Sequence, residues 1–169
     1  MAKIDNSTIF IAVIEANKGI LYKVANSYCK DFEDRNDLVQ EIILKLWQAF
    51  DTYNDEFKHS TWIYRIALNT AISNYRKEKV RKKYFTPLSG SILEWHDVDN
   101  TAEKEHKYQL LQQFILELKD LDKALLLLYL DEKNYKEIAE ILGISESNVG
   151  TKISRLKNLL KDKFIKENL

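Results

Sequence analysis

Residues that interrupt helices are scarce in this chain, and their scarcity limits the fold more than any other feature. Among 169 residues there are one proline and four glycines. No stretch sustains the alternation of apolar and polar residues that is typical of a half-buried strand. Apolar residues recur instead at helical spacing, as Ile11, Ile14, Leu21, Val24 and Tyr28 do near the start. We therefore expect an all-α protein.

Two helices are expected before residue 51. The first covers about residues 7–29, and Gly19 is a candidate break within it. The second covers residues 38–50 and is amphipathic, with apolar residues on one face and polar residues on the other. A polar loop, residues 30–37, precedes it. Asp37 is its expected N-cap, because a carboxylate accepts the free backbone N–H groups of a first helical turn.

A third helix is expected from Ser60, its natural N-cap, to Lys83. Its first half is apolar except for a thin stripe of Arg65, Asn69 and Ser73, which are spaced four apart and share one face. Its end carries six basic residues against the single acid Glu78: Arg76, Lys77, Lys79, Arg81, Lys82 and Lys83. The helix macrodipole favours one or two cations at a C-terminus, so the excess indicates a phosphate backbone as partner.

The helical pattern stops at about Lys83. Residues 83–104 contain the only proline, Pro87, together with Gly90 and a series of acids. This composition is typical of an interdomain linker, and about 20 extended residues could span on the order of 60 Å. We expect two small helical domains, residues 1–82 and 105–169, joined by a flexible linker over residues 83–104.

The second domain is expected to end in a helix-turn-helix. Asn134 and Glu137 have the spacing of a capping box, Gly143 suits the left-handed residue after a helix, and Ser145 suits the cap of the next helix. From Val149 to Lys161 there is no acid. The side chains expected to be exposed on this second helix are Asn148, Thr151, Lys152, Arg155 and Lys157. Such a layout is typical of a DNA-reading motif, and an ordinary antiparallel helix pair is the alternative.

The formal net charge is zero, from 26 basic and 26 acidic residues, but the charges are segregated. Basic residues gather in two segments, residues 76–83 and 152–166, and each segment is therefore expected to act as a local anion-binding surface. Near the first of them, Tyr53 lies in a polar loop and Asn69 on the polar stripe. An aromatic ring and an amide beside a basic surface suit an unstacked base, the first by stacking and the second by hydrogen bonds.

Nothing in the sequence indicates catalysis or a metal site. His59, His96 and His106 stand alone, without the neighbouring histidine or cysteine that a zinc site needs. We expect no cofactor, no small-molecule substrate and no enzymatic activity. Cys29 is the only cysteine, which excludes an internal disulfide and favours a reducing compartment. No apolar run is long enough for a membrane span, so we expect a soluble cytoplasmic protein.

Three blocks of the sequence, in order, resemble those of the extracytoplasmic-function (ECF) sigma factors of bacterial RNA polymerase. They are DLVQEIILKLWQAF, FKHSTWIYRIALNTAISNYRKEKVR and YKEIAEILGISESNVGTKISRLKNLLK. The resemblance implies a protein that directs core polymerase to promoters and helps to open them. It implies contact with the clamp of the large polymerase subunit and with promoter DNA. Members of this family are often held inactive by an anti-sigma factor.

The resemblance also implies three sets of contact residues. The polymerase-binding set is Asp37, Leu38, Gln40, Glu41 and Lys45. The set for the minus-ten element is Tyr53, Tyr64, Asn69, Ser73, Asn74, Arg76 and Lys77. The set for the minus-thirty-five element is Asn148, Gly150, Thr151, Lys152, Ser154, Arg155 and Lys157, of which Lys152 and Lys157 would hold phosphates. At Gly150 relatives often carry a basic residue, and at Asn74 many have aspartate.

Two other kinds of protein would explain part of the sequence. A dimeric helix-turn-helix regulator would use the second domain but leave the acidic helix before residue 51 and the basic end of the third helix without a role. A helical RNA-binding or structural protein would need no duplex-reading motif.

Overall fold

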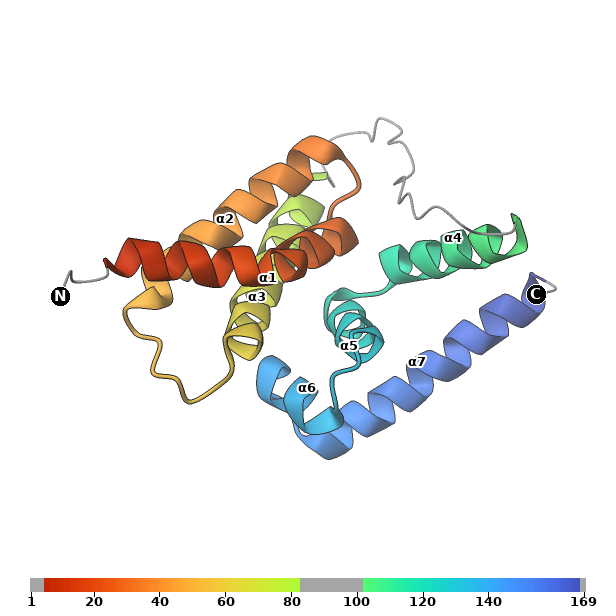
Figure 1. Ribbon diagram of the computed structural model, residues 1–169. Helices are drawn as coiled ribbons and strands as arrows, with labels where there is room; N and C mark the ends of the chain where they lie inside the picture. Colours follow the sequence, from red (N-terminus) through yellow and green to blue (C-terminus); the bar gives the residue numbers. More distant parts are fainter. Residues whose placement is uncertain (1–4, 83–101, 168–169) are drawn as a thin grey trace. The chain divides into compact units, whose positions relative to one another are not determined.

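The computed structural model describes residues 5–82 and 102–167. As the scarcity of helix-breaking residues predicts, they form seven α-helices and no strand. The chain divides into two compact units, Met1–Ser91 and Ile92–Leu169. The helices are α1 (Asn6–Tyr28), α2 (Phe32–Phe50), α3 (His59–Lys82), α4 (Ala102–Glu117), α5 (Asp120–Leu130), α6 (Tyr135–Leu142) and α7 (Glu146–Lys166), labelled in Figure 1.

In the N-terminal unit α1, α2 and α3 pack against one another in all three pairs (Figure 1). The core consists of the apolar stripes that face each other. Its least exposed side chains are Leu21, Val24, Ala25, Ile42, Leu46, Ile63, Tyr64, Ala67, Leu68 and Ala71, none more than 1% exposed. Full burial of a leucine or isoleucine side chain contributes about 1.5–3 kcal/mol, so these stripes account for the stability of the unit.

Helix α1 differs from the expectation in two details. It continues through Gly19, which is exposed and has no atom within 4 Å of the place where a Cβ would lie. A single glycine costs an α-helix only about 1 kcal/mol, which the packing of the rest of α1 offsets. Ile11 is not part of the core, because 60% of it is exposed, and Phe10 is buried in its place.

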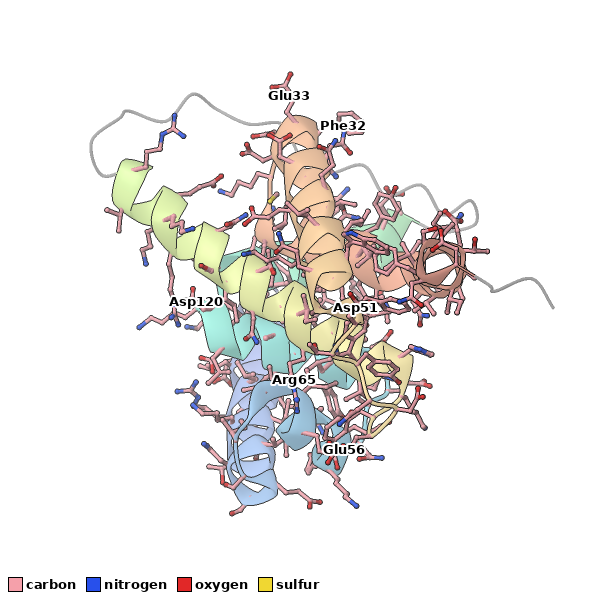
Figure 2. All side chains as sticks on the ribbon, turned by 90° about the vertical axis from the view of Figure 1, so that its left-hand side faces the viewer. Phe32, Glu33, Asp51, Glu56, Arg65 and Asp120 are labelled. Carbon is pink, nitrogen blue, oxygen red and sulfur yellow. The ribbon has the colours of Figure 1, made fainter. Side chains whose placement is uncertain are left out.

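Helix α2 begins earlier than expected. Asp31, rather than Asp37, is its N-cap and accepts a hydrogen bond of 2.8 Å from the backbone N–H of Asp34. Most of the expected loop over residues 30–37 is therefore helical. Glu33 and Asp34 lie in the first turn, where the helix dipole favours negative charge. Figure 2 shows Phe32 and Glu33 at one end of α2 and Asp51 at the other.

Helix α3 is continuous, as its sequence predicts, but it begins at His59. Ser60 therefore lies in the first turn and is not the N-cap. The expected linker, residues 83–104, lies outside the described residues up to residue 101, and α4 already begins at Ala102. The boundaries of the two domains and the flexibility of the linker stay predictions.

In the C-terminal unit α5, α6 and α7 contact one another, and α4 packs against α5 and α7. The expected caps of the helix-turn-helix are confirmed. Asn134 and Glu137 form both hydrogen bonds of a capping box, of 2.9 and 3.0 Å. Gly143 ends α6 with φ of 67°, and Ser145 accepts a hydrogen bond from the backbone N–H of Asn148 at the start of α7.

Two glycine-to-alanine substitutions should change stability in opposite directions. Gly19→Ala removes backbone entropy from the unfolded chain without a clash, so the free energy of unfolding of the N-terminal unit should rise by roughly 0.5–1 kcal/mol. Gly143→Ala places a Cβ on a left-handed residue and should lower that of the C-terminal unit by about 1–2 kcal/mol. Hydrogen-exchange mass spectrometry of each unit measures both, and effects of the same sign would contradict this account.

Candidate nucleic-acid interface

The stripe along α3 is only partly exposed. Asn69 and Ser73 are exposed, whereas Arg65 is half-buried and its guanidinium carbon lies 5.0 Å from the centre of the Phe57 ring. Figure 2 shows Arg65 on α3 and Glu56 in the preceding loop. The basic residues that follow on α3 and have described side chains are all exposed: Arg76, Lys77, Lys79 and Arg81. From Asn69 onward, α3 therefore presents an amide, a hydroxyl and four cations to a partner.

Tyr53 lies in the loop before α3 and is half-buried. Its hydroxyl donates a hydrogen bond to the backbone carbonyl of Phe57, and its ring stacks on His59 at 4.7 Å between centroids. The Trp62 ring is 5.1 Å away. These contacts close the loop onto the first turns of α3, so a base that stacks on Tyr53 would have to share the ring with His59 and Trp62.

Two residues from the expected contact sets belong to the core instead. Tyr64 is 0% exposed and Leu38 is 3% exposed. Both side chains lie between helices of the N-terminal unit. The contact sets place Tyr64 on the DNA surface and Leu38 on the polymerase surface, and direct contact there would require the surrounding side chains to move. Both assignments stay predictions.

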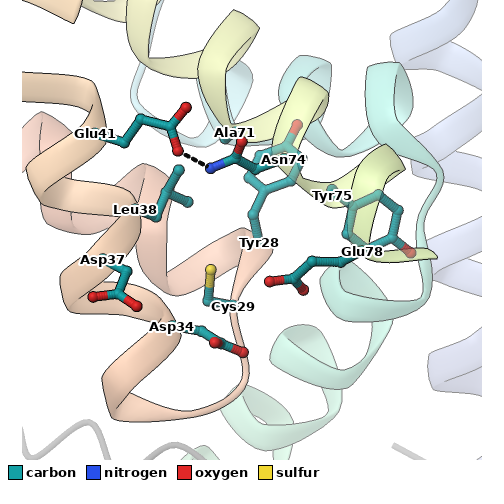
Figure 3. A pocket seen from close by; sticks show the side chains of 10 residues that line it. All are labelled: Tyr28, Cys29, Asp34, Asp37, Leu38, Glu41, Ala71, Asn74, Tyr75 and Glu78. Atoms are coloured by element: carbon teal, nitrogen blue, oxygen red, sulfur yellow. Dashed lines mark hydrogen bonds between the residues drawn. The ribbon is translucent and has the colours of Figure 1, made fainter. Parts of the chain in front are cut away.

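Asn74, another member of the expected minus-ten set, has a side chain that contacts α2. Its Nδ2 donates a hydrogen bond to Oε2 of Glu41, as Figure 3 shows. The two residues line a small pocket together with Cys29, Asp34 and Glu78 among others. Asn74 is half-buried there. While this bond is made, one N–H of the Asn74 amide is engaged with α2, and its second N–H and Oδ1 remain for other contacts.

The face of α2 opposite the core is exposed and carries polar and apolar residues. Asp37, Gln40 and Lys45 are exposed, whereas Glu41 is half-buried. Leu44 and Trp47 lie on the same face by helical spacing and are 53% and 44% exposed. The Trp47 ring still touches the core through an edge contact with Phe10, at 5.0 Å between centroids. The exposed face of α2 therefore combines two apolar side chains with charged and amide side chains.

On α7 the side opposite the buried residues Val149, Ile153 and Leu156 is exposed. The structure brings most of the expected DNA-reading residues onto this side: Asn148, Thr151, Ser154 and Arg155 are exposed there. Lys152 and Lys157 lie at its two borders, by helical spacing, and Lys152 is half-buried.

Two cations of α7 are held by α5. Arg155 Nη2 donates a hydrogen bond to Asp122 Oδ2 at 2.6 Å. Lys157 Nζ lies 4.4 Å from the centre of the Tyr129 ring. Hydrogen bonding to Tyr129 raises the pKa of Lys157, so its ammonium stays charged at physiological pH.

Gly150 is half-buried against α6. A Cβ at this position would lie 3.5 Å from Cε2 of Tyr135, which is ordinary van der Waals contact. A side chain at this position would therefore begin next to the Tyr135 ring of α6. The expected contact of Gly150 with the minus-thirty-five element stays a prediction.

Two family models match the chain, one to each unit. The model described as Sigma-70 region 2 matches residues 13–81, and the one described as Sigma-70, region 4 matches residues 108–160. The ECF RNA polymerase sigma factor SigM of Bacillus subtilis (strain 168) is 32% identical over 142 residues, which cover 83% of this chain and 86% of SigM. This chain belongs to the ECF RNA polymerase sigma factors.

Other relatives of this sigma factor agree. The RNA polymerase sigma factor YlaC of Bacillus subtilis (strain 168) is 33% identical, with 79% of each chain covered. The ECF RNA polymerase sigma-E factor of Escherichia coli (strain K12) is 30% identical, with 77% of this chain and 73% of the relative covered. The expected sigma-factor function in transcription initiation is confirmed, and the dimeric-regulator alternative has no support among these relatives.

Two solved structures share the fold of the sigma factor. One is the sigma factor RpoE in complex with the anti-sigma factor NepR from Bartonella quintana, with a TM-score of 0.72 and coverage of 94% and 95% of the two chains. The other is CnrH in complex with the cytosolic domain of CnrY, with a TM-score of 0.64 and coverage of 90% and 85%. Each is 19% identical to this chain, so both establish likeness of fold.

Sequence reasoning missed some exposed residues of the sigma factor. Leu44 and Trp47 were not expected at the α2 surface, although they interrupt its polar face at the spacing of Gln40 and Gln48. On α7, Ser147 and Asn158 extend the exposed face at both ends. In both helices the helical period of 3.6 residues could have found them, because it places these uncharged residues on the same face as the charged ones.

Two further observations concern the described parts of the sigma factor. No group of three or more His, Cys, Asp or Glu side chains in residues 5–82 and 102–167 could hold a metal ion. Within the same residues, every helix is too short or too polar to cross a membrane.

Replacement of Asn74 tests whether its hydrogen bond to Glu41 stabilises the N-terminal unit. Asn74→Ala removes a hydrogen bond to a carboxylate, so the N-terminal unit should lose about 1–2 kcal/mol of unfolding free energy. Ser73→Ala is the matched control, since it gains the same helix propensity at an exposed neighbour and should not destabilise the unit. Hydrogen exchange of α2 and α3 amides measures the difference. Identical behaviour of the two variants would show that the bond to Glu41 contributes nothing.

Cys29 should be an unreactive thiol. Burial, assisted by Glu78, Asp34 and Asp31, raises its pKa to about 12. The thiolate is the reactive form, so alkylation by iodoacetamide at pH 8 should be slower than in the urea-unfolded chain by a factor on the order of a thousand. The rate should increase with pH through pH 10, because the thiol is still far from fully ionised. A native rate within tenfold of the unfolded rate would contradict the raised pKa.

Proposed function

We propose that this sigma factor uses three separate surfaces, each on one helix of its own unit, for three different contacts. The exposed face of α2 binds the polymerase clamp, α3 from Asn69 onward with its preceding loop binds the minus-ten element, and the exposed side of α7 reads the minus-thirty-five element. The observation that carries the proposal is that the α2 and α7 surfaces lie opposite buried stripes of the same helices, while α3 continues past its buried residues with exposed cations.

The α2 surface suits a protein partner. Leu44 and Trp47 can be buried on binding, while Asp37, Gln40 and Lys45 around them give directional contacts. A surface that combines apolar anchors with a polar rim is typical of specific protein interfaces. Glu41 supports this face indirectly, because it is engaged with Asn74.

The α3 surface suits an opened strand of DNA. Four exposed cations on its second half attract phosphates, and the Asn69 amide can donate and accept hydrogen bonds on the edge of a base. Capture of a base outside the helix stack offsets an unstacking cost of a few kcal/mol. Promoter opening then needs no chemical step, only a pocket that prefers the unpaired base.

The α7 surface suits the major groove. Thr151, Ser154 and Arg155 are exposed on the side of the helix that faces away from the core. An arginine donates two hydrogen bonds to O6 and N7 of guanine, and this is the commonest specific contact in the major groove. Lys152 and Lys157, at the borders of this side, would contact phosphates.

The minus-ten and minus-thirty-five contacts lie on one chain, so formation of one raises the effective concentration of the other. Two weak contacts together thus make the complete complex selective.

The proposal includes a place of action and a regulator. A protein that works with core polymerase on promoter DNA acts in the bacterial cytoplasm. RpoE of Bartonella quintana, which shares the fold, binds the anti-sigma factor NepR. An anti-sigma factor that covers the polymerase-binding or DNA-binding surfaces would hold this chain inactive.

Transcription by purified core polymerase tests the function as a whole. Genomic fragments are transcribed with and without this protein, and the RNA 5′ ends are mapped. The protein should produce new, specific start sites that core polymerase alone lacks. The proposal fails if core polymerase does not bind the chain or starts no more selectively with it.

Asn69→Ala tests the base contact on α3. Loss of hydrogen bonds to one base should reduce promoter opening about fivefold, as measured by permanganate reactivity of unpaired thymines. Affinity for core polymerase should stay unchanged, because Asn69 lies on α3 and not on the exposed face of α2. Gln113→Ala, an exposed amide on α4, is the matched control and should leave opening unchanged. Weaker core binding by Asn69→Ala would contradict the assignment.

A further inference from the structure

Asp122 is absent from every expected contact set, yet it holds the arginine expected to read DNA. Asp122 lies in the first turn of α5, 33 residues before Arg155 in the chain. The two side chains form an ion pair of 2.6 Å in which the carboxylate is 18% exposed and the arginine 55% exposed. The guanidinium is therefore at the surface, and its anchor lies beneath it.

Stability alone explains this pair poorly. Fully exposed ion pairs contribute about 0–1 kcal/mol, because ordering two side chains offsets most of the attraction, and in this pair the 18% exposed carboxylate also loses solvation. Asp122 also benefits from the dipole of α5, but Asp120 occupies the same first turn and supplies the same effect. Neither reason requires that Asp122 meet a particular residue of α7.

Orientation explains the pair better. Arginine loses about 2 kcal/mol of rotamer entropy when it is fixed, and a bidentate contact to guanine requires its planar fork in one orientation. Within the described residues, the hydrogen bond to Asp122 uses Nη2 only. Four of the five N–H donors of the guanidinium therefore remain for DNA. A side chain ordered before DNA arrives loses less freedom on binding.

Helix α5 also contacts a second cation of α7, Lys157. Tyr129 follows Asp122 by seven residues, so both lie on one face of α5, and its ring lies against Lys157. Two side chains of one α5 face thus hold two cations of α7. The arrangement is a support for the cations of the reading helix rather than an isolated surface pair.

We propose that Asp122 is a positioning residue that orients Arg155 for base reading and so raises promoter selectivity without touching a base. This inference rests on the proposed DNA contact of Arg155. Asp122→Asn keeps the shape of the side chain and removes its charge. The lost negative charge strengthens binding to any DNA, and the loosened guanidinium weakens discrimination. The ratio of specific to nonspecific affinity should fall about fivefold, a partial loss of the discrimination of one bidentate contact.

The experiment uses holoenzyme assembled from core polymerase and the full chain. The specific probe is a DNA fragment enriched by the wild-type holoenzyme from a library randomised upstream of the start site. The nonspecific probe is the same fragment with its upstream element scrambled. Dissociation constants are measured for both. Asp162→Asn is the matched control, because it removes the same charge from an exposed position of α7. Glu117→Gln removes the carboxylate that pairs with Lys163 at 2.6 Å. Both controls should keep the ratio.

A double-mutant cycle separates the DNA contact of Arg155 from the positioning of Arg155 by Asp122. Arg155→Ala alone should lower the ratio, and adding Asp122→Asn to it should change the ratio no further. If Arg155→Ala leaves the ratio unchanged, the proposed base contact fails. If Arg155→Ala lowers the ratio but Asp122→Asn behaves like Asp162→Asn, only the positioning role fails. If Asp122→Asn strengthens binding to both probes equally, Asp122 competes with DNA for Arg155 and does not orient it.

A conservative variant keeps the test decisive if Asp122→Asn does not fold. Asp122→Glu retains the charge but moves the carboxylate outward by one methylene. Its ratio should fall while its affinity for the scrambled fragment stays at the wild-type value. If the guanidinium of Arg155 is displaced in this variant and the ratio still equals the wild-type value, the positioning role is overturned. Thermal unfolding of each variant confirms that the compared proteins are folded.

Discussion

Burial of one stripe on each of α2, α3 and α7 determines where all the other side chains of these helices point. In α2 the stripe contains Ile42 and Leu46, and in α7 it contains Ile153 and Leu156, all 1% exposed or less. Because a helix has a fixed period, the opposite face is then presented to solvent in a defined register. Packing energy and binding geometry are thus set by the same few apolar residues.

Local signals in the sequence predicted most of the fold. The caps around α6 and α7 act within three residues of Asn134 and Ser145, so their chemistry can be read directly from the chain. The cap of α2 could not be settled this way, because Asp31 and Asp37 offer the same carboxylate before helical residues. The structure decides between them, because Asp31 accepts the backbone N–H of Asp34 and α2 begins at Phe32.

The candidate site was predictable only in part, for a related reason. Exposed members such as Asn69 and Arg155 follow from periodicity and charge. Tyr64 did not, because a tyrosine at a helix surface and one in a core look alike until the neighbouring helices are placed. The partnership of Asn74 with Glu41 joins residues 33 positions apart, and no local pattern reports it. Contacts between helices therefore could not be predicted from local sequence patterns.

The caps of the helix-turn-helix have a consequence for how such proteins diversify. Asn134, Gly143 and Ser145 hold the motif together without contributing to its outward face. Outward residues such as Thr151 and Ser154 can consequently change during evolution while the motif keeps its shape. Paralogues built on this frame could acquire new regulons by drift at a handful of surface positions, with little cost in thermal robustness.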